Sequence, residues 1–194
     1  MILFVSITSF AQKGMSKNKK ALISSVEKHK SKLIEISDKI WEAAEPALLE
    51  FKSSKYLSDY AEENGFTVHK GVAGIPTAFI AEYGSGKPII GIMGEFDANA
   101  GISQKKQPTK DPLLKGAAGH GCGHNLFGTA SLGAAIAIKE MIESGKITGT
   151  VRFYGTPAEE GGSGKVYMVR DGLFNDVDIV LHWHPDDNNS ANSK

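Results

Sequence analysis

The sequence predicts an α/β sandwich, a central sheet with helices on both of its faces. Two observations predict this class. Segments with apolar residues at helical spacing alternate along the chain with short runs typical of strands. In addition, 194 residues of which 41% are hydrophobic suffice to form the core of one domain. Ligand sites in such folds gather at strand ends, so functional residues are expected there.

Two amphipathic helices are expected first. From about residue 19, apolar residues recur at helical spacing between charged ones until Pro46 interrupts the pattern. These apolar residues are Leu22, Val26, Leu33, Ile36, Ile40 and Trp41. The second helix is expected over residues 48–63 and ends at Asn64 and Gly65. Both helices are expected to serve packing.

Strands and two more helices follow. Strands are expected over residues 67–72, 77–83, 88–94, 150–155 and 177–182, the last of them buried. The polar residues 99–115 predict an exposed loop. Residues 126–144 predict a helix whose many Gly and Ala residues would let it lie close to the sheet. Residues 163–172 predict a short helix with Ser163 as its N-cap.

The two ends of the chain differ in composition from the rest. Residues 2–11 are apolar, end in small residues and precede a basic run, which is the pattern at the end of an export signal. The basic leading region of such a signal is missing, so a frayed or mis-started terminus is the alternative. We therefore expect a signal remnant or disordered N-terminus over residues 1–18, one catalytic domain over 19–185 and a polar tail over 186–194. Export to the periplasm and a cytoplasmic location both remain open.

The charge balance and the single cysteine narrow the classes of function. Lys and Arg together number 22, as do Asp and Glu, so no net field favours nucleic acid or an anionic membrane as a partner. A small-molecule ligand is expected instead. Cys122 is the only cysteine, which rules out an internal disulfide and leaves its thiol free for chemistry.

The segment GHGCGHN, residues 119–125, predicts a metal site. It places Cys122 two residues from His120 and from His124, with glycines between them. Thiolate and imidazole are ligands that a borderline-soft divalent ion prefers, and glycine permits close approach of the backbone. The helix that follows would direct the positive end of its dipole towards a thiolate at Cys122.

Three predicted strands end in further candidate residues. The strand IIGIMGEFD ends in Glu95 and Asp97, and TVRFYGT runs into the adjacent acids Glu159 and Glu160. The last strand runs into His182 and His184. Thiolate, imidazoles and carboxylates at neighbouring strand ends are the side chains of a metal-dependent hydrolase.

Adjacent glutamates fit metal-assisted hydrolysis because the reaction needs two carboxylates in different roles. One binds the metal, and the other is the general base for the attacking water. The following GGSGK segment does not fit a phosphate-binding loop, since Glu159 stands where that motif needs Gly and Val166 where it needs Ser or Thr.

Taken together, HGCGHN, GTPAEEGGSGK and WHP resemble the amidohydrolase branch of the zinc-dependent aminoacylase and glutamate carboxypeptidase family. The resemblance covers most of residues 20–190. It implies a zinc-exopeptidase-like fold with a mixed sheet, of which the chain holds the N-terminal part of the catalytic domain. By position, the metal ligands would be Cys122, His124, Glu160 and His184. The resemblance also implies that Glu159 is the catalytic base, that Asp97 orients the site, and that His120 and His182 have supporting positions.

The same resemblance implies two divalent ions, zinc or manganese, and hydrolysis of an amide between an acyl or aryl group and an amino acid. Two departures stand out. Asp97 is followed by Ala-Asn-Ala, where relatives usually have Ala-Leu-Pro. The family's lid and dimerisation domain and a distant histidine ligand would lie beyond residue 194. We therefore expect a truncated catalytic domain here, and a homo-oligomer only in the full-length protein.

Two other functions are compatible with these residues. In one, the chain is a catalytically incomplete metal-binding fragment or interaction module. In the other, Cys122 is the nucleophile of a thiol hydrolase with His120 or His124 as its base. The spacing of two residues is poor geometry for that pair, since such partners usually come from elsewhere in the fold. His29 and His69 are expected at the surface.

Overall fold

The computed structural model describes residues 15–188 and 190. Its centre is a mixed sheet of five strands in the order β1-β2-β4-β3-β5, which confirms the predicted fold class. The strands are β1 (Thr67–Lys70), β2 (Phe79–Ser85), β3 (Ile89–Gly94), β4 (Gly149–Gly155) and β5 (Ile179–Leu181). β2 pairs antiparallel with β1 and with β4, whereas β3 runs parallel to β4 and to β5.

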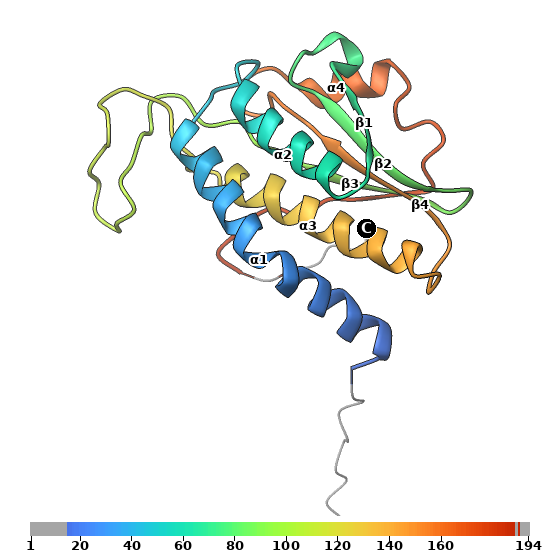
Figure 1. Ribbon diagram of the computed structural model, residues 1–194. Helices are drawn as coiled ribbons and strands as arrows, with labels where there is room; N and C mark the ends of the chain where they lie inside the picture. Colours follow the sequence, from blue (N-terminus) through green and yellow to red (C-terminus); the bar gives the residue numbers. More distant parts are fainter. Residues whose placement is uncertain (1–14, 189, 191–194) are drawn as a thin grey trace, which may run out of the picture.

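Helices cover both faces of this sheet. They are α1 (Lys17–Ala43), α2 (Phe51–Glu63), α3 (His124–Glu143) and α4 (Gly164–Arg170), with a 3-10 turn, η1, at Val72–Gly74. Phe79 and Ala81 of β2 face the core formed with α1, α2 and α3, while Ile80 between them packs on the side of α4. This alternation follows from the two-residue period of a strand. Figure 1 shows α1, α2 and α3 together on one side, with α3 against the sheet.

Local sequence explains where the helices begin and end. Ser16 caps α1 by accepting a hydrogen bond from the backbone N–H of Lys19, and Ala44 ends the helix in the left-handed conformation. The helix expected from residue 126 begins two residues earlier, at His124. Ser163 lies at the N-cap position of α4 but its side chain makes no capping hydrogen bond, contrary to expectation.

The small residues of α3 do bring it close to the sheet. A Cβ atom at Gly128 would lie 2.6 Å from the carbonyl oxygen of Glu95, just beyond β3. Only glycine therefore fits where the helix crosses this strand end. That close approach places the N-terminus of α3 beside the residues that follow β3.

The prediction of a buried last strand is wrong. β5 lies at the edge of the sheet, pairs over three residues with β3 alone, and leaves the side chains of Ile179, Val180 and Leu181 about half exposed. A run of apolar residues favours burial on both faces, but it does not distinguish a central strand from an edge strand. Within the described residues, no strand pairs with the outer edge of β5.

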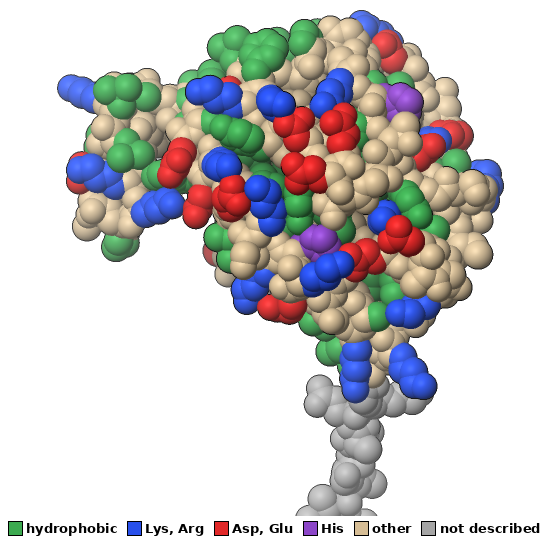
Figure 2. All heavy atoms as spheres, viewed as in Figure 1, with side chains coloured by type: hydrophobic (Ala, Val, Ile, Leu, Met, Phe, Trp, Pro, Cys, Tyr) green, Lys and Arg blue, Asp and Glu red, His purple; other side chains and the backbone are tan. Residues whose placement is uncertain are grey.

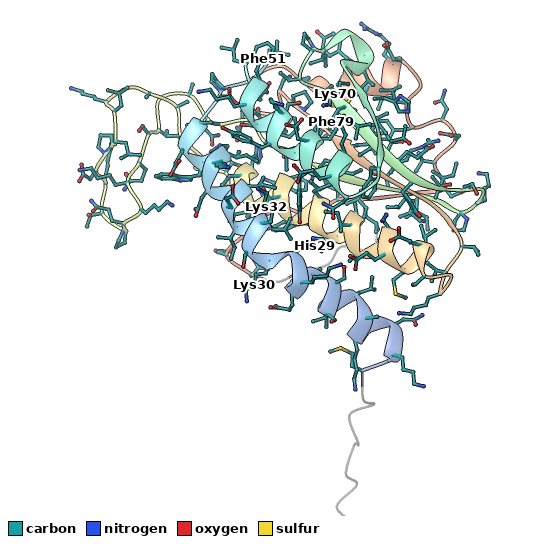
Figure 3. The ribbon with its side chains drawn as sticks, viewed as in Figure 1. His29, Lys30, Lys32, Phe51, Lys70 and Phe79 are labelled. Atoms are coloured by element: carbon teal, nitrogen blue, oxygen red, sulfur yellow. The ribbon has the colours of Figure 1, made fainter. Side chains whose placement is uncertain are left out.

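His29 is not a surface residue, although His69 is exposed as expected. The side chain of His29, on α1, is 12% exposed (Figure 3). Nδ1 accepts a hydrogen bond from the hydroxyl of Tyr60 on α2 at 2.6 Å, and Nε2 donates to Glu140 on α3 at 3.0 Å. His29 thus links the three helices on this face.

The surface agrees with the neutral composition. Acidic and basic side chains are interspersed over the face shown in Figure 2. The polar segment 99–117 forms an irregular loop that projects from the domain (Figure 1). No helix in residues 15–188 is both long and apolar enough to cross a bilayer. The expected export signal lies almost entirely outside the described residues.

Candidate metal centre

The candidate site lies where three strands and one helix converge. β3, β4 and β5 are parallel, so the residues that follow them meet at one edge of the sheet. Glu95 and Asp97 follow β3, the Glu159-Glu160 turn follows β4, and His184 follows β5. The N-terminus of α3 brings His124 to the same edge.

His124 is the centre of this cluster and is fully buried. Its Nδ1 lies 2.9 Å from Asp97 Oδ1, and its Nε2 lies 2.9 Å from Glu95 Oε2. Burial alone would lower the pKa of His124, but the close carboxylates of Asp97 and Glu95 raise it to about 10. One imidazole therefore joins the acids that follow β3 to the start of α3.

Cys122 and His184 adjoin His124. Cys122 Sγ is 3.3 Å from His184 Nε2, which is itself 3.4 Å from His124 Nε2. The three ligand atoms all lie within 4.8 Å of one another. Burial, together with Glu160 and Glu159 nearby, raises the pKa of the Cys122 thiol to about 11. The sequence-predicted set of thiol and imidazoles is thus brought together.

The two adjacent glutamates approach the Nε2 atom of the same imidazole. Glu159 Oε2 lies 4.0 Å and Glu160 Oε1 lies 3.8 Å from His124 Nε2. Their exposures differ, 44% for Glu159 and 20% for Glu160. The backbone N–H of Glu160 donates to Asp97 Oδ2 at 2.8 Å, so Asp97 holds this turn with one oxygen and His124 with the other.

Two charged residues at this site received no role from the sequence: Glu95, named only as a strand-end candidate, and Lys165. Glu95 is 2% exposed, and Lys165 of α4 forms an ion pair with its Oε1. Burial alone would raise the pKa of Glu95, but His124 and Lys165 lower it to about 2. The only signal in the sequence was the position of Glu95 at a strand end, because Lys165 lies 70 residues away.

The two histidines expected in supporting positions lie differently. His182 Nε2 is 3.5 Å from Glu95 Oε1, and the ring packs edge-on against Phe127, so His182 borders the cluster. His120 instead donates from Nε2 to the carbonyl of Ile40 at the end of α1, at 3.1 Å. Burial lowers the pKa of His120 to about 4, so this ring is neutral at pH 7.

The side chains fit divalent metal ions. Two buried carboxylate oxygens are incompletely satisfied among the described residues: Glu160 Oε1 has no hydrogen-bond partner, and Glu95 Oε2 has only the ion pair with His124. Such atoms are costly to bury unless a cation satisfies them. A second group with metal-site spacing, Glu95, His124 and Glu159, shares His124 with the first. Thiolate, imidazole and carboxylate together suit zinc, and the carboxylates also accept manganese.

Comparison with known proteins agrees with this arrangement. The model of Peptidase family M20/M25/M40 matches residues 105–193. One of the subunits of the p-aminobenzoyl-glutamate hydrolase of Escherichia coli K12 is 51% identical over 164 residues, which are 83% of this chain and 34% of that protein. The Xaa-Arg dipeptidase of Mus musculus is 31% identical over 168 residues, 80% of this chain and 35% of that protein.

A solved structure gives the same result. The crystal structure of a dinuclear metal binding peptidase of the M20 family from Bacillus subtilis superposes with a TM-score of 0.67 at 26% identity, over 84% of this chain and 44% of that one. The chain spans about a third of the length of its curated relatives. Fold, motifs and relatives agree with the resemblance found in the sequence, and the chain belongs to Peptidase family M20/M25/M40.

Proposed function

We propose that the protein, at the full length of its relatives, hydrolyses the amide bond between an acyl or aryl group and an amino acid. The observation that carries this proposal is the position of Glu159 and Glu160. They face a thiol and two imidazoles at one edge of the sheet, with Glu159 the more exposed of the pair. The names of the relatives, p-aminobenzoyl-glutamate hydrolase and Xaa-Arg dipeptidase, support the same bond type.

We assign the metal ligands to Cys122, His124, Glu160 and His184. Two divalent ions, zinc or manganese, would act when bound as Lewis acids that polarise the attacking water and the amide carbonyl. The dinuclear relative from Bacillus subtilis supports two ions rather than one. Glu95, buried beside His124, adds negative charge that favours a cation at this position.

The remaining chemistry belongs to side chains of this chain. Glu159 is the general base: a carboxylate oxygen takes the proton of the attacking water and then gives it to the nitrogen of the leaving amine. Asp97 holds the Nδ1 side of His124, so that Nε2 points into the site, and it holds the turn at Glu160. Residues 19–185 would form the part of the catalytic domain that contains these groups.

The proposal is tested on the full-length protein with p-aminobenzoyl-glutamate or hippurate, with and without a chelator. Chelation is expected to abolish hydrolysis, and zinc or manganese to restore it. Glu159→Gln should lower kcat by about 10²-fold to 10⁴-fold, the usual contribution of a general base, while the bound metal is retained. Glu63→Gln, an exposed acid on α2, is the matched control and should keep the full rate.

A thiol mechanism is the second candidate because the thiol of Cys122 contacts His184 at 3.3 Å. The surrounding acids oppose it, since they help to raise the pKa of this thiol. Chelation and alkylation distinguish the metal mechanism from the thiol mechanism. Hydrolysis that survives chelation but is lost on alkylation of metal-free protein would establish the thiol mechanism. Metal content of the 194-residue chain, combined with absence of turnover, would establish a catalytically incomplete metal-binding module.

A multimeric full-length protein also remains a prediction. The Escherichia coli relative is named as one subunit of its enzyme, which supports association with another chain. Light scattering of the full-length protein would show whether it is a homo-oligomer.

A further inference from the structure

Glu50 is a buried carboxylate to which neither the motifs nor the ligand set gives a role. It lies at the N-cap position of α2 and is 0% exposed. Among the described residues, no Lys, Arg or His forms an ion pair with it. Burial raises the pKa of Glu50, and only hydrogen-bond donors oppose this shift. A glutamate retained in such a place calls for an explanation, because an apolar side chain of similar size would cost less to bury.

The contacts of Glu50 lead to the turn that carries the proposed base. Its Oε1 accepts hydrogen bonds from the backbone N–H of Leu48 at 2.9 Å and of Ala158 at 2.8 Å. Its Oε2 accepts from the hydroxyl of Thr77 at 3.0 Å. Ala158, the residue directly before Glu159, is 108 residues away in the sequence. Glu50 is therefore a long-range connection between the start of α2 and the Glu159-Glu160 turn.

The backbone of that turn needs such an anchor. Ala158 is fully buried and has a φ of 59°, in the left-handed region that an alanine adopts at a cost of about 1–2 kcal/mol. On the other side of Glu159, the backbone N–H of Glu160 is held by Asp97. Two buried carboxylates from distant segments thus fix the amides on both sides of the base, while the side chain of Glu159 itself remains partly exposed.

We propose that Glu50 is a positioning residue that holds the Ala158 amide and thereby fixes Glu159 against the metal ligands. This inference rests on the proposed function for its catalytic consequence, but the contact itself does not. Positioning matters because a displacement of about 1 Å can cost about 10²-fold in rate. Glu50 acts through the backbone and does not touch the reacting atoms.

The first test measures amide hydrogen exchange by NMR in the 194-residue chain. Glu50 makes no side-chain capping hydrogen bond on α2, so Glu50→Ser removes no cap from the helix, and serine is too short to reach Ala158. We expect exchange at Ala158 to accelerate about 10-fold to 100-fold, as for the loss of a hydrogen bond to a charged acceptor. Exchange at Val151 and Phe153 in β4 should change much less. Glu50→Gln retains an acceptor and should behave like the wild type.

Glu45→Ser is the matched control. Glu45 accepts hydrogen bonds at the start of α2, from the backbone of Lys52 and Ser53, but its side chain accepts none from Ala158. An equal acceleration at Ala158 in both Ser variants, or none in Glu50→Ser, would overturn the proposal. If Glu50→Ser does not fold, the wild type is tested instead, by measuring the NMR coupling between the Ala158 nitrogen and the Glu50 carboxyl carbon across their hydrogen bond. Absence of this coupling would overturn the proposal.

The second test is kinetic and uses the full-length protein. Glu50→Ser should lower kcat by about 10²-fold with KM nearly unchanged, and Glu50→Gln should restore most of the rate. A Gln variant as slow as the Ser variant would overturn the positioning role. If the wild type hydrolyses no acyl amino acid with any metal, the proposed function fails, whereas the exchange experiment still decides whether Glu50 holds the turn.

Discussion

At the scale of single residues, the turn that carries Glu159 depends on a glycine. A Cβ atom at Gly164 would overlap the carbonyl oxygen of Pro157, on the other arm of the turn. The backbone N–H of Gly164 also donates to the carbonyl of Ala158. We predict that Gly164→Ala lowers the free energy of unfolding by about 1–3 kcal/mol, the range for overpacking. Urea denaturation followed by circular dichroism measures this change.

Gly161 provides the control within the same turn. A Cβ atom there would meet only the side chain of Ala47, at an ordinary contact distance of 3.6 Å. Gly161→Ala should therefore leave the free energy of unfolding within about 0.5 kcal/mol of the wild type, as surface substitutions usually do. Similar losses in both variants would show that the turn tolerates neither side chain, and that the overlap with Pro157 is not the cause.

Residue types and spacing predicted part of the site and missed another part. Cys122, His124, Glu159 and Glu160 stand in short motifs whose chemistry can be read locally. Glu50 stands in no such motif, and Lys165 ends the GTPAEEGGSGK motif without a role that can be read locally, because their partners Ala158 and Glu95 lie 108 and 70 residues away. A buried charge and the group that satisfies it become visible only when the chain has folded.

At the scale of elements, periodicity predicted the types of the helices and strands but not their environment. For β2 and β4, the sequence pattern correctly indicated burial, because helices pack on both faces of these strands. It failed for β5, where apolar residues occupy an edge strand. It failed also for His29, a polar residue on an amphipathic helix, because the contact with Glu140 depends on how α1 and α3 pack.

This contact between helices predicts a pH-dependent stability. Burial alone would raise the pKa of Glu140, but hydrogen bonds from His29 and Lys28 lower it from 4.5 to about 2. A lowered carboxyl pKa stabilises the fold above the unfolded value near 4.5, and this stabilisation is lost as the pH falls towards 2. Glu140→Gln should therefore cost about 0.5–1 kcal/mol at pH 7, as expected of a partly exposed pair, and almost nothing near pH 2. Urea denaturation of the metal-free chain at several pH values measures the difference.

Glu143→Gln serves as the comparison on the same helix. Glu143 is 54% exposed and pairs with Lys139 one turn away, so it does not connect α3 to α1. Its substitution should have a smaller effect at pH 7. If Glu140→Gln costs the same at pH 2.5 as at pH 7, the stabilisation comes from packing rather than from the charge on Glu140.

At the scale of the whole molecule, the proposed ligands come from segments that are far apart in the chain. Cys122 and His124 precede and begin α3, Glu160 follows β4, and His184 follows β5. These groups meet only in the folded state, so an ion that binds them together should stabilise that state. The edge strand β5, which is held by β3 alone, should benefit because His184 would be tied to the start of α3.

We therefore predict that zinc or manganese at about 100 times its dissociation constant stabilises the 194-residue chain by about 2.7 kcal/mol, through binding to the folded state alone. Thermal denaturation with and without the ion measures the shift in Tm, and magnesium, which prefers oxygen ligands, should have a smaller effect. The double variant Cys122→Ser/His184→Ala should lose most of the shift. His69→Ala, an exposed histidine on β1, should keep it. Equal shifts in the two variants would place the bound ion elsewhere on the surface and would remove the basis for assigning Cys122 and His184 as ligands.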